Sequence, residues 1–241
     1  YDANGNAAST SQSNNTVTLN DLTGPTMTIT AAEGADGFTS NDATLSLTFT
    51  SSETTTNFTA DDITVGGGSL GTLSGSGKVY TATFTPSGSG ATTIDVAADK
   101  FTDAAGNNNT AATQFNWTYD GTVPTITASA VNAANTKVTV TFSEAVYNTN
   151  GGSGDLEVGD FVFSISGGTA TLASATPTAI AKTSQLIWVL DVNLNGTADG
   201  SETLTVSPAS TAIYDANGNA ASTSQSNNTV TLNDFAVPTI T

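Results

Sequence analysis

The chain of 241 residues contains no cysteine and no histidine, and its only basic side chains are four lysines, Lys78, Lys100, Lys137 and Lys182. Without cysteine there are no disulfides and no thiolate metal sites. Without histidine, the usual zinc ligand and general base are both missing. No apolar run approaches the length of a membrane span, and no segment reads as a signal peptide. We therefore expect no membrane insertion, no disulfide framework and no zinc site.

The charge of the chain is strongly one-sided. Against the four lysines stand 21 Asp and Glu residues, which gives a formal net charge of −17. Nucleic acids and anionic membrane surfaces both require a basic patch, so neither is expected as a partner. Two interpretations of the carboxylates stay open: they bind divalent cations, or they only keep the surface soluble.

One segment occurs twice without change. The letters YDANGNAASTSQSNNTVTLND fill residues 1–21 and return at 214–234, and a weaker echo relates 101–127 to 213–241. The period of 213 residues (214 − 1) suits two small β domains. We interpret the chain as a piece of a longer repeat protein. The expected parts are the last strand and linker of a preceding repeat (1–21), a first domain (22–120), a second domain (121–234) and the first strand of a following repeat (235–241).

The hydrophobic pattern inside each expected domain is that of β-strands. Residues 44–51 (TLSLTFTS) and 137–144 (KVTVTFSE) alternate apolar and polar side chains, and Gly- and Asn-rich turns separate such runs. About seven short strands per domain indicate an antiparallel β-sandwich. The tryptophans are most simply core residues, with sugar stacking as the alternative. The expected core anchors are Phe49, Phe84, Phe101, Trp117, Phe142, Phe161, Phe163 and Trp188.

Several motifs of the second domain resemble a known family. VPTIT, KVTVTFSEAV, DFVFS, SETLTVSP and IYDANGN are similar to the bacterial Ig-like repeats of giant secreted surface proteins and adhesins. The resemblance implies an all-β fold of two tandem Ig-like antiparallel β-sandwich domains arranged end to end. It also implies a bacterial cell-surface or extracellular location and a stalk commonly stiffened by calcium (Ca²⁺).

The sharpest local motif is DVNLNGTADGSE at 191–202, which fits the calcium-loop pattern D-x-[DN]-x-[DN]-G-x5-E. Alternate residues of such a loop turn oxygens toward one centre, glycine allows the sharp turn, and the last glutamate binds with two oxygens. The alternative is a plain polar turn after the strand LIWVLDV. The expected ligands are Asp191, Asn193, Asn195, Asp199 and Glu202.

A second group of candidate ligands follows from the topology of a seven-stranded sandwich, which gathers the linker and particular loops at one pole of each domain. We expect a cluster of Asp and Glu side chains at this pole. Such a cluster resembles the cadherin-like junctions in which calcium, bound by carboxylates, locks neighbouring domains end to end. The alternative for each single acid is a solvated loop residue, and the DANGN and DAAGN loops also read as tight turns. The expected metal ligands are Asp21, Glu53, Asp62 and Asp103 at the pole of the first domain, and Asp120, Glu144, Asp160 and Asp215 at the pole of the second, with Asp234 after it. Asp21, Asp120 and Asp234 are the acids of the linkers.

Repetition at the level of identity suits a spacer and not an active site. We expect no enzyme, but a non-catalytic extender of a large adhesin with calcium at the junctions between domains. A ligand-binding adhesin module for carbohydrate, a surface or ice is the alternative. The expected partners are the neighbouring Ig-like repeats of the same chain, in a monomeric rod. The strand within 1–21 is expected either to hang loose or to pair with an edge or a neighbouring chain by strand exchange.

Overall fold

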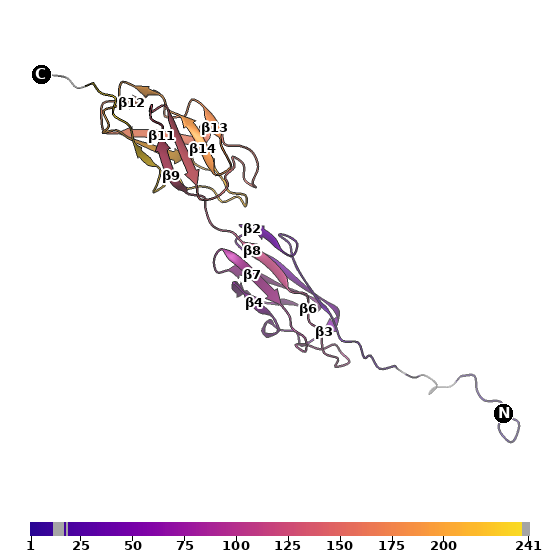
Figure 1. Ribbon diagram of the computed structural model, residues 1–241. Coiled ribbons are helices and arrows are strands. Elements are labelled where there is room, and N and C mark those ends of the chain that lie inside the picture. Colours follow the sequence, from indigo (N-terminus) through magenta and orange to yellow (C-terminus); the bar gives the residue numbers. More distant parts are fainter. Residues whose placement is uncertain (12–16, 18, 238–241) are drawn as a thin grey trace. The chain divides into compact units, whose positions relative to one another are not determined.

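The chain folds as an all-β protein in the computed structural model (Figure 1). The structure describes residues 1–11, 17 and 19–237. Helical turns among these residues are limited to two 3-10 helices, η1 (Ala60–Asp62) and η2 (Val158–Asp160). The first strands are β1 (Met27–Ala31), β2 (Phe38–Ser40), β3 (Leu45–Thr55), β4 (Thr64–Gly66), β5 (Gly68–Leu70), β6 (Ser74–Pro86), β7 (Gly90–Asp95) and β8 (Phe115–Tyr119). The later strands are β9 (Ile126–Val131), β10 (Lys137–Phe142), β11 (Phe161–Ser166), β12 (Thr171–Leu172), β13 (Ile180–Lys182), β14 (Ile187–Asp191), β15 (Leu194–Asn195), β16 (Thr203–Pro208) and β17 (Thr229–Thr231).

Strands β1 to β8 form two four-stranded sheets with the orders β1–β3–β6–β5 and β2–β8–β7–β4. β2 runs parallel to β8, whereas β1, β3 and β6 pair antiparallel. β3 buries Leu45, Leu47 and Phe49 on one face. The alternation predicted for residues 44–51 is therefore present, and the strand continues to Thr55.

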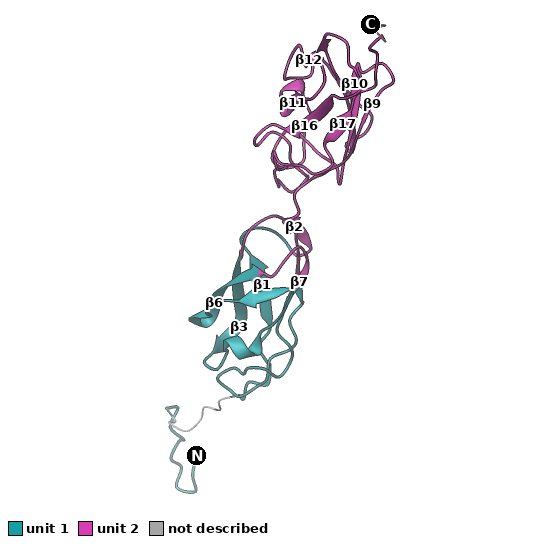
Figure 2. Cartoon of the chain, turned by 90° about the vertical axis from the view of Figure 1, so that its left-hand side faces the viewer, with its two compact units in different colours: residues 1–35, 45–85, 93–115 teal, residues 36–44, 86–92, 116–241 magenta. Residues whose placement is uncertain are grey.

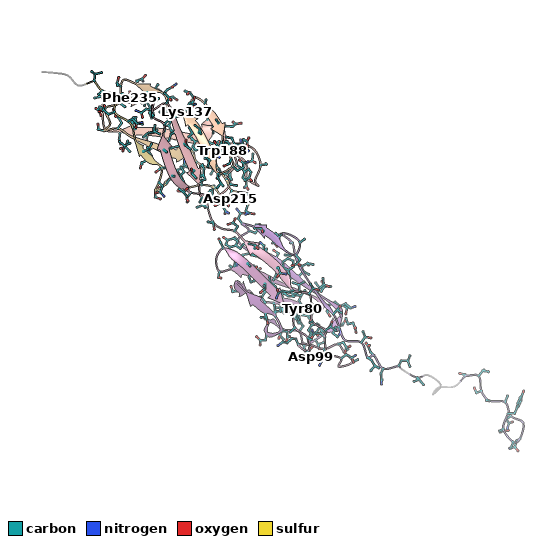
Figure 3. All side chains as sticks on the ribbon, viewed as in Figure 1. Tyr80, Asp99, Lys137, Trp188, Asp215 and Phe235 are labelled. Carbon is teal, nitrogen blue, oxygen red and sulfur yellow. The ribbon has the colours of Figure 1, made fainter. Side chains whose placement is uncertain are left out.

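Strands β9 to β17 form three antiparallel sheets with the orders β13–β14–β10–β9, β11–β16–β17 and β12–β15. Val140 of β10 lies opposite Trp188 of β14, and both side chains are buried. Figure 3 marks Trp188 on its strand. Phe161 and Phe163 of β11 face inward in the same alternating way.

The chain divides into two compact units, which Figure 2 colours separately. Unit 1 comprises residues 1–35, 45–85 and 93–115; unit 2 comprises residues 36–44, 86–92 and 116–241. Residues 36–44, 86–92 and 116–120, which we expected in the first domain, group with unit 2, and the boundary at 120 stays a prediction.

Each unit has its own aromatic core. In unit 1, the ring of Phe58 packs edge-on against Tyr80 and Phe101, at centroid distances of 5.0 and 5.1 Å. In unit 2, Phe142 and Phe161 lie 6.4 Å apart within a continuous apolar cluster. All eight aromatic residues predicted as core anchors are buried. The prediction of a β-sandwich core built on them is confirmed.

The ends of the chain differ from the predicted strands. The described part of residues 1–21 is exposed and contains no strand. Residues 235–237 contain none either, and the rest of the predicted strand at 235–241 lies outside the described residues. Strand exchange through 1–21 stays a prediction.

Candidate metal centres

A five-residue loop, Asp-Ala-Asn-Gly-Asn, closes on its own first side chain at residues 215–219. Asp215 accepts hydrogen bonds from the backbone N–H and the side-chain amide of Asn219, both at 2.8 Å. The backbone N–H of Asp215 donates to the Asn219 carbonyl (3.1 Å). Gly218 has φ +92°, in the left-handed region that favours glycine. The predicted turn is therefore present, and it fixes the direction of the buried Asp215 carboxylate.

The related sequence at residues 103–107 builds the same loop. Asp103 accepts from the backbone N–H (2.9 Å) and the side-chain amide (2.8 Å) of Asn107. Gly106 again has φ +92°. The Asn107 amide holds the pKa of Asp103 below its ordinary value, against the effect of burial. The carboxylate is thus kept charged in a position where the loop also orients it.

A glutamate lies at or just beyond the end of a core strand in each unit. Glu53 belongs to β3, and Glu144 follows β10 by two residues. Each glutamate is preceded by a serine that exchanges two hydrogen bonds with a threonine on the incoming segment. These pairs are Ser52 with Thr26 (3.0 and 2.9 Å) and Ser143 with Thr125 (2.8 and 3.0 Å). Each glutamate is therefore held beside the segment that leads into its unit, which carries Asp21 in the first case and Asp120 in the second.

These preceding aspartates, Asp21 and Asp120, are bound in corresponding ways. In each aspartate, one carboxylate oxygen accepts a hydrogen bond from the backbone N–H of the residue two positions later. Its main-chain carbonyl accepts a second hydrogen bond, from the side-chain amide of the asparagine that ends the neighbouring Asp-x-x-Gly-Asn loop. The donors are Thr23 (3.0 Å) and Asn107 (3.1 Å) for Asp21, and Thr122 (3.1 Å) and Asn219 (2.9 Å) for Asp120.

The result is two groups of three carboxylates. In each group one oxygen from every member lies within 4.8 Å of the others. We call Asp21, Glu53 and Asp103 the first triad, and Asp120, Glu144 and Asp215 the second triad. Asp215 is marked in Figure 3. Six of the predicted ligands are thus brought together, three in each unit.

The donor set decides which ions could fit. Three carboxylates are hard oxygen donors, which suit Ca²⁺ and not a soft or borderline metal. Calcium takes six to eight oxygens in flexible geometry, so water and main-chain carbonyls would supply the remaining ligands. The triads could therefore hold calcium in each unit.

Comparison with known proteins agrees with this fold. Residues 21–119 match the family model described as bacterial Ig-like domain. The first triad lies within this matched segment, which begins at Asp21. No curated protein matches the chain.

Two solved bacterial structures are also similar to the chain. One is FdeC, an Escherichia coli adhesin, with 16% identity, a TM-score of 0.39, and coverage of 86% of this chain and 63% of that one. The other is InvD of Yersinia pseudotuberculosis, with 17% identity, a TM-score of 0.33, and coverage of 89% and 61%. The chain thus spans less than two thirds of the length of either structure.

In unit 1, the electrostatics of the first triad centre on Glu53. Burial raises the pKa of Glu53, and the charges of Asp21 and Asp103 raise it further, whereas Lys78 acts to lower it. Lys78 donates a hydrogen bond to the carbonyl of Ser52 (2.7 Å), which holds its ammonium group near the triad. A basic side chain therefore offsets part of the repulsion between the three carboxylates.

The second triad has a different neighbourhood. Burial raises the pKa of Glu144, and Asp215 and Asp120 add to the rise, with no lysine among its causes. The side-chain amide of Asn217 donates to the carboxylate of Asp120 (2.7 Å). The position equivalent to Asn217 in the loop of unit 1 is Ala105, so this bond is specific to the second triad.

The calcium-loop motif at 191–202 is arranged differently from the triads. Asp191 ends strand β14 and forms an ion pair with Lys137. The buried carboxylate of Glu202 accepts backbone N–H groups from Thr169 (3.0 Å), Ala170 (2.9 Å) and Asp199 (3.0 Å). These bonds hold the pKa of Glu202 below its ordinary value, although burial acts to raise it. The carboxylates of this motif are not among the groups that lie within 4.8 Å in the described chain.

The remaining residues of that motif take part in backbone pairing and in a turn. Asn195 is paired with Thr171 through the short strands β15 and β12. Asn193 accepts the backbone N–H of Ala173 at its carbonyl (2.9 Å). Asp199 accepts the backbone N–H of Ser201 (3.0 Å). The backbones of Asn193 and Asn195 are therefore engaged in strand pairing and the Asp199 side chain in a turn. The calcium site of this motif stays a prediction.

Three further predicted ligands lie outside both triads. Asp62 and Asp160 each close a 3-10 turn by accepting a backbone N–H three residues earlier, from Thr59 (2.8 Å) and Glu157 (2.7 Å). Burial raises the pKa of Asp160. Asp234 accepts the backbone N–H of Ala236 (2.8 Å), as the other linker aspartates do with their own loops. The metal role of these three residues stays a prediction.

The sequence analysis missed Asn107, Asn219 and Lys78. The asparagines were visible as the last letter of DAAGN and DANGN, but they were interpreted only as turn residues. In the structure they also join the loop to the connecting aspartate.

No helix in the described part of the chain is long and apolar enough to cross a membrane.

Proposed function

We propose that the chain is a non-catalytic extender segment of a large bacterial cell-surface or secreted adhesin, and that both triads bind calcium. The observation that carries the proposal is the repetition of one arrangement. A connecting aspartate, a strand-end glutamate and a loop aspartate lie within 4.8 Å of one another in each unit. Three carboxylates at this distance repel one another, and a divalent cation would remove the repulsion.

We expect calcium to restrict the motion of the segments that contain Asp21 and Asp120, and to contribute little to the folding stability of the domains. Extracellular calcium modules bind with Kd on the order of 10⁻⁴–10⁻³ M. At ten times Kd, each site stabilises the bound state by about 1.4 kcal/mol. This is small beside the stability of a domain but large for a short connection between strands, such as that from β8 to β9. Calcium would therefore act mainly on the stiffness of the chain.

A calcium titration of the whole chain tests the proposal. We expect two binding events by isothermal titration calorimetry, a higher melting temperature with calcium, and a longer maximum dimension in small-angle X-ray scattering. EDTA should reverse the last two effects. Identical melting and scattering curves with calcium and with EDTA would contradict the calcium role and leave the fold unaffected.

Matched variants assign the binding to the triads. Glu53→Gln and Glu144→Gln should each remove one binding event, because each keeps the side-chain shape and removes one charge. Asp61→Asn is the control, since Asp61 is exposed and belongs to neither triad. Loss of a binding event in Asp61→Asn, or its retention in both glutamate variants, would place calcium elsewhere.

A second candidate function, binding of a neutral carbohydrate, is favoured by the outward face of sheet β1–β3–β6. Strand register places Thr30 opposite Thr48 and Thr48 opposite Thr81, and Ser46 lies opposite Thr83. The rows form a hydroxyl-rich surface without a charged side chain in them. Such a face could donate and accept hydrogen bonds to sugar hydroxyls.

A glycan array with the wild-type chain and Thr48→Lys tests this candidate. Thr48 lies in the middle of the threonine row, so a long charged side chain there should block a flat ligand. Binding that is lost in Thr48→Lys supports the carbohydrate role. An array without a bound glycan, or binding unchanged in the variant, contradicts it.

A further inference from the structure

Unit 2 holds residues 214–234 through contacts to residues outside that segment. Tyr214 exchanges two backbone hydrogen bonds with Tyr147, both at 2.8 Å. Strand β17 pairs antiparallel with β16, and the backbone N–H of Leu232 donates to the carbonyl of Glu202 (3.0 Å). The Leu232 side chain is only 2% exposed. Together these contacts define an acceptor surface on unit 2, made by Tyr147, β16 and Glu202.

The sequence that fills this acceptor surface is also present at residues 1–21. Each residue of the first copy corresponds to the residue 213 positions later, so Leu19 corresponds to Leu232 and Tyr1 to Tyr214. The apolar side chains of the first copy are unburied: Tyr1, Val17 and Leu19 are 94%, 85% and 87% exposed. A buried and an exposed version of the same segment therefore occur in one chain.

The first copy already has the local conformation needed for docking at one end. Asp2 accepts from the backbone N–H (2.9 Å) and the side-chain amide (2.8 Å) of Asn6, as Asp215 does from Asn219. Gly5 has φ +81°. The loop therefore forms without the acceptor surface, and docking would not have to reorganise it.

We propose that the acceptor surface of unit 2 also binds residues 1–21 of a second copy of the chain, which replace residues 214–234 by strand exchange. Both segments can make the same backbone and side-chain contacts, because their sequences are identical. The balance is therefore set by concentration and not by contact energy. A resident segment tethered to its own unit has an effective concentration on the order of millimolar. The closed monomer dominates in dilute solution, and the exchanged form increases with chain concentration.

Such an exchange joins successive chains head to tail. The donor segment precedes unit 1 in sequence, and the acceptor surface belongs to unit 2, so the two contacting surfaces are different. Contacts of this heterologous kind form rings if they close and open chains if they do not. Refolding at high concentration should favour them, since both copies of the segment are then undocked when the acceptor surface forms.

The test is refolding of the full chain from denaturant at low and high concentration, followed by size-exclusion chromatography with light scattering. We expect monomers at low concentration and a fraction of dimers and larger species that grows with concentration. Leu19→Asp should reduce that fraction by about tenfold or more, because its carboxylate would have to be buried where Leu232 lies. Leu22→Asp is the control: Leu22 is 85% exposed and lies one residue beyond the duplicated segment.

Cysteine trapping checks the register of the exchanged segment. The chain has no cysteine of its own, so a Tyr1→Cys chain can be mixed with a Tyr147→Cys chain and refolded under oxidising conditions. A backbone-paired position places Cα atoms about 5.5 Å apart, within disulfide range. We expect a mixed disulfide dimer, and much less of it when Leu19→Asp is added to the Tyr1→Cys chain. Only monomers at every concentration, equal oligomers in Leu19→Asp and wild type, or no mixed disulfide would each overturn the proposal.

Discussion

The side-chain amide of Asn219 donates a hydrogen bond to the main-chain carbonyl of Asp120, at 2.9 Å. The same nitrogen donates to the carboxylate of Asp215. One side chain therefore joins the connecting aspartate to the loop aspartate and sets the position of both. Asn107 joins Asp21 to Asp103 in the same way.

We expect Asn219→Ala to lower the free energy of unfolding by about 1–3 kcal/mol, because the buried Asp215 carboxylate loses a donor. Urea denaturation in EDTA measures the change. Asn6→Ala is the matched control, since Asn6 makes the same loop bonds to Asp2 but in an exposed position. Equal effects of the two substitutions would contradict a role for the Asn219 contacts beyond the loop itself.

Glu144 should make the chain less stable at neutral pH than at mildly acidic pH in the absence of calcium. Burial and the charges of Asp215 and Asp120 raise the pKa of Glu144 above its ordinary value of 4.5. The folded state therefore binds the proton more readily than the unfolded state, and stability from this group increases as pH falls through the raised pKa toward 4.5. Above that window the ionised group is unfavourable in the folded state.

Glu144→Gln tests this pH dependence. In EDTA we expect the variant to melt at a higher temperature than wild type at pH 7, with the difference shrinking as pH falls toward 4.5. Acids with lowered pKa values, such as Asp103 and Glu202, act in the opposite direction in both proteins and cancel in the comparison. A variant that melts below wild type at pH 7 would contradict the repulsion within the second triad.

Lys78→Met should strengthen calcium binding at the first triad. The ammonium group acts on Glu53 and competes with a cation for the same negative charge. The effect of an exposed charge pair is small, so the expected decrease in Kd is at most about fivefold. Calorimetric titration of Lys78→Met in the Glu144→Gln background isolates the first triad. An unchanged Kd would mean that Lys78 does not influence the bound ion.

Glu202→Gln should destabilise unit 2 without changing the calcium response. The carboxylate accepts three backbone N–H groups in a buried position, and an amide would turn donor hydrogens toward some of them. The expected loss is about 1–3 kcal/mol in urea denaturation. A lost calcium-binding event in this variant, with stability otherwise retained, would show instead that the 191–202 motif binds the ion.

The sequence predicted the strands and the core because alternation and burial are local properties. Leu45, Leu47 and Phe49 lie on one face of β3 for the reason that their spacing indicated. The triads could be predicted in part, because the echo between 101–127 and 213–241 placed Asp103 and Asp215 in equivalent positions. The bonds from Asn107 and Asn219 to the connecting aspartates could not, since they join residues that are 86 and 99 positions apart in sequence.

The acids that the sequence grouped with the triads show where a pattern has a second meaning. Asp62 follows Thr59 by three residues, which is the spacing of a side chain that closes a helical turn, and its carboxylate is used in that way. The 191–202 motif has calcium-loop spacing, but Asp191 continues strand β14 and pairs with Lys137 across the sheet. Spacing alone could not show that Asp191 lies in a strand, and the calcium role of the motif stays a prediction.

The loop that closes at Asp2 and Asn6 has a consequence for the order of folding. Its hydrogen bonds join residues only two and four apart in sequence, and they are present where no strand surrounds them. Local contacts of this kind form early, since little chain has to be brought together before they exist. We expect the equivalent loops at 103–107 and 215–219 to close before their sheets are complete, so that each loop carboxylate is already oriented when folding brings the rest of its triad to it.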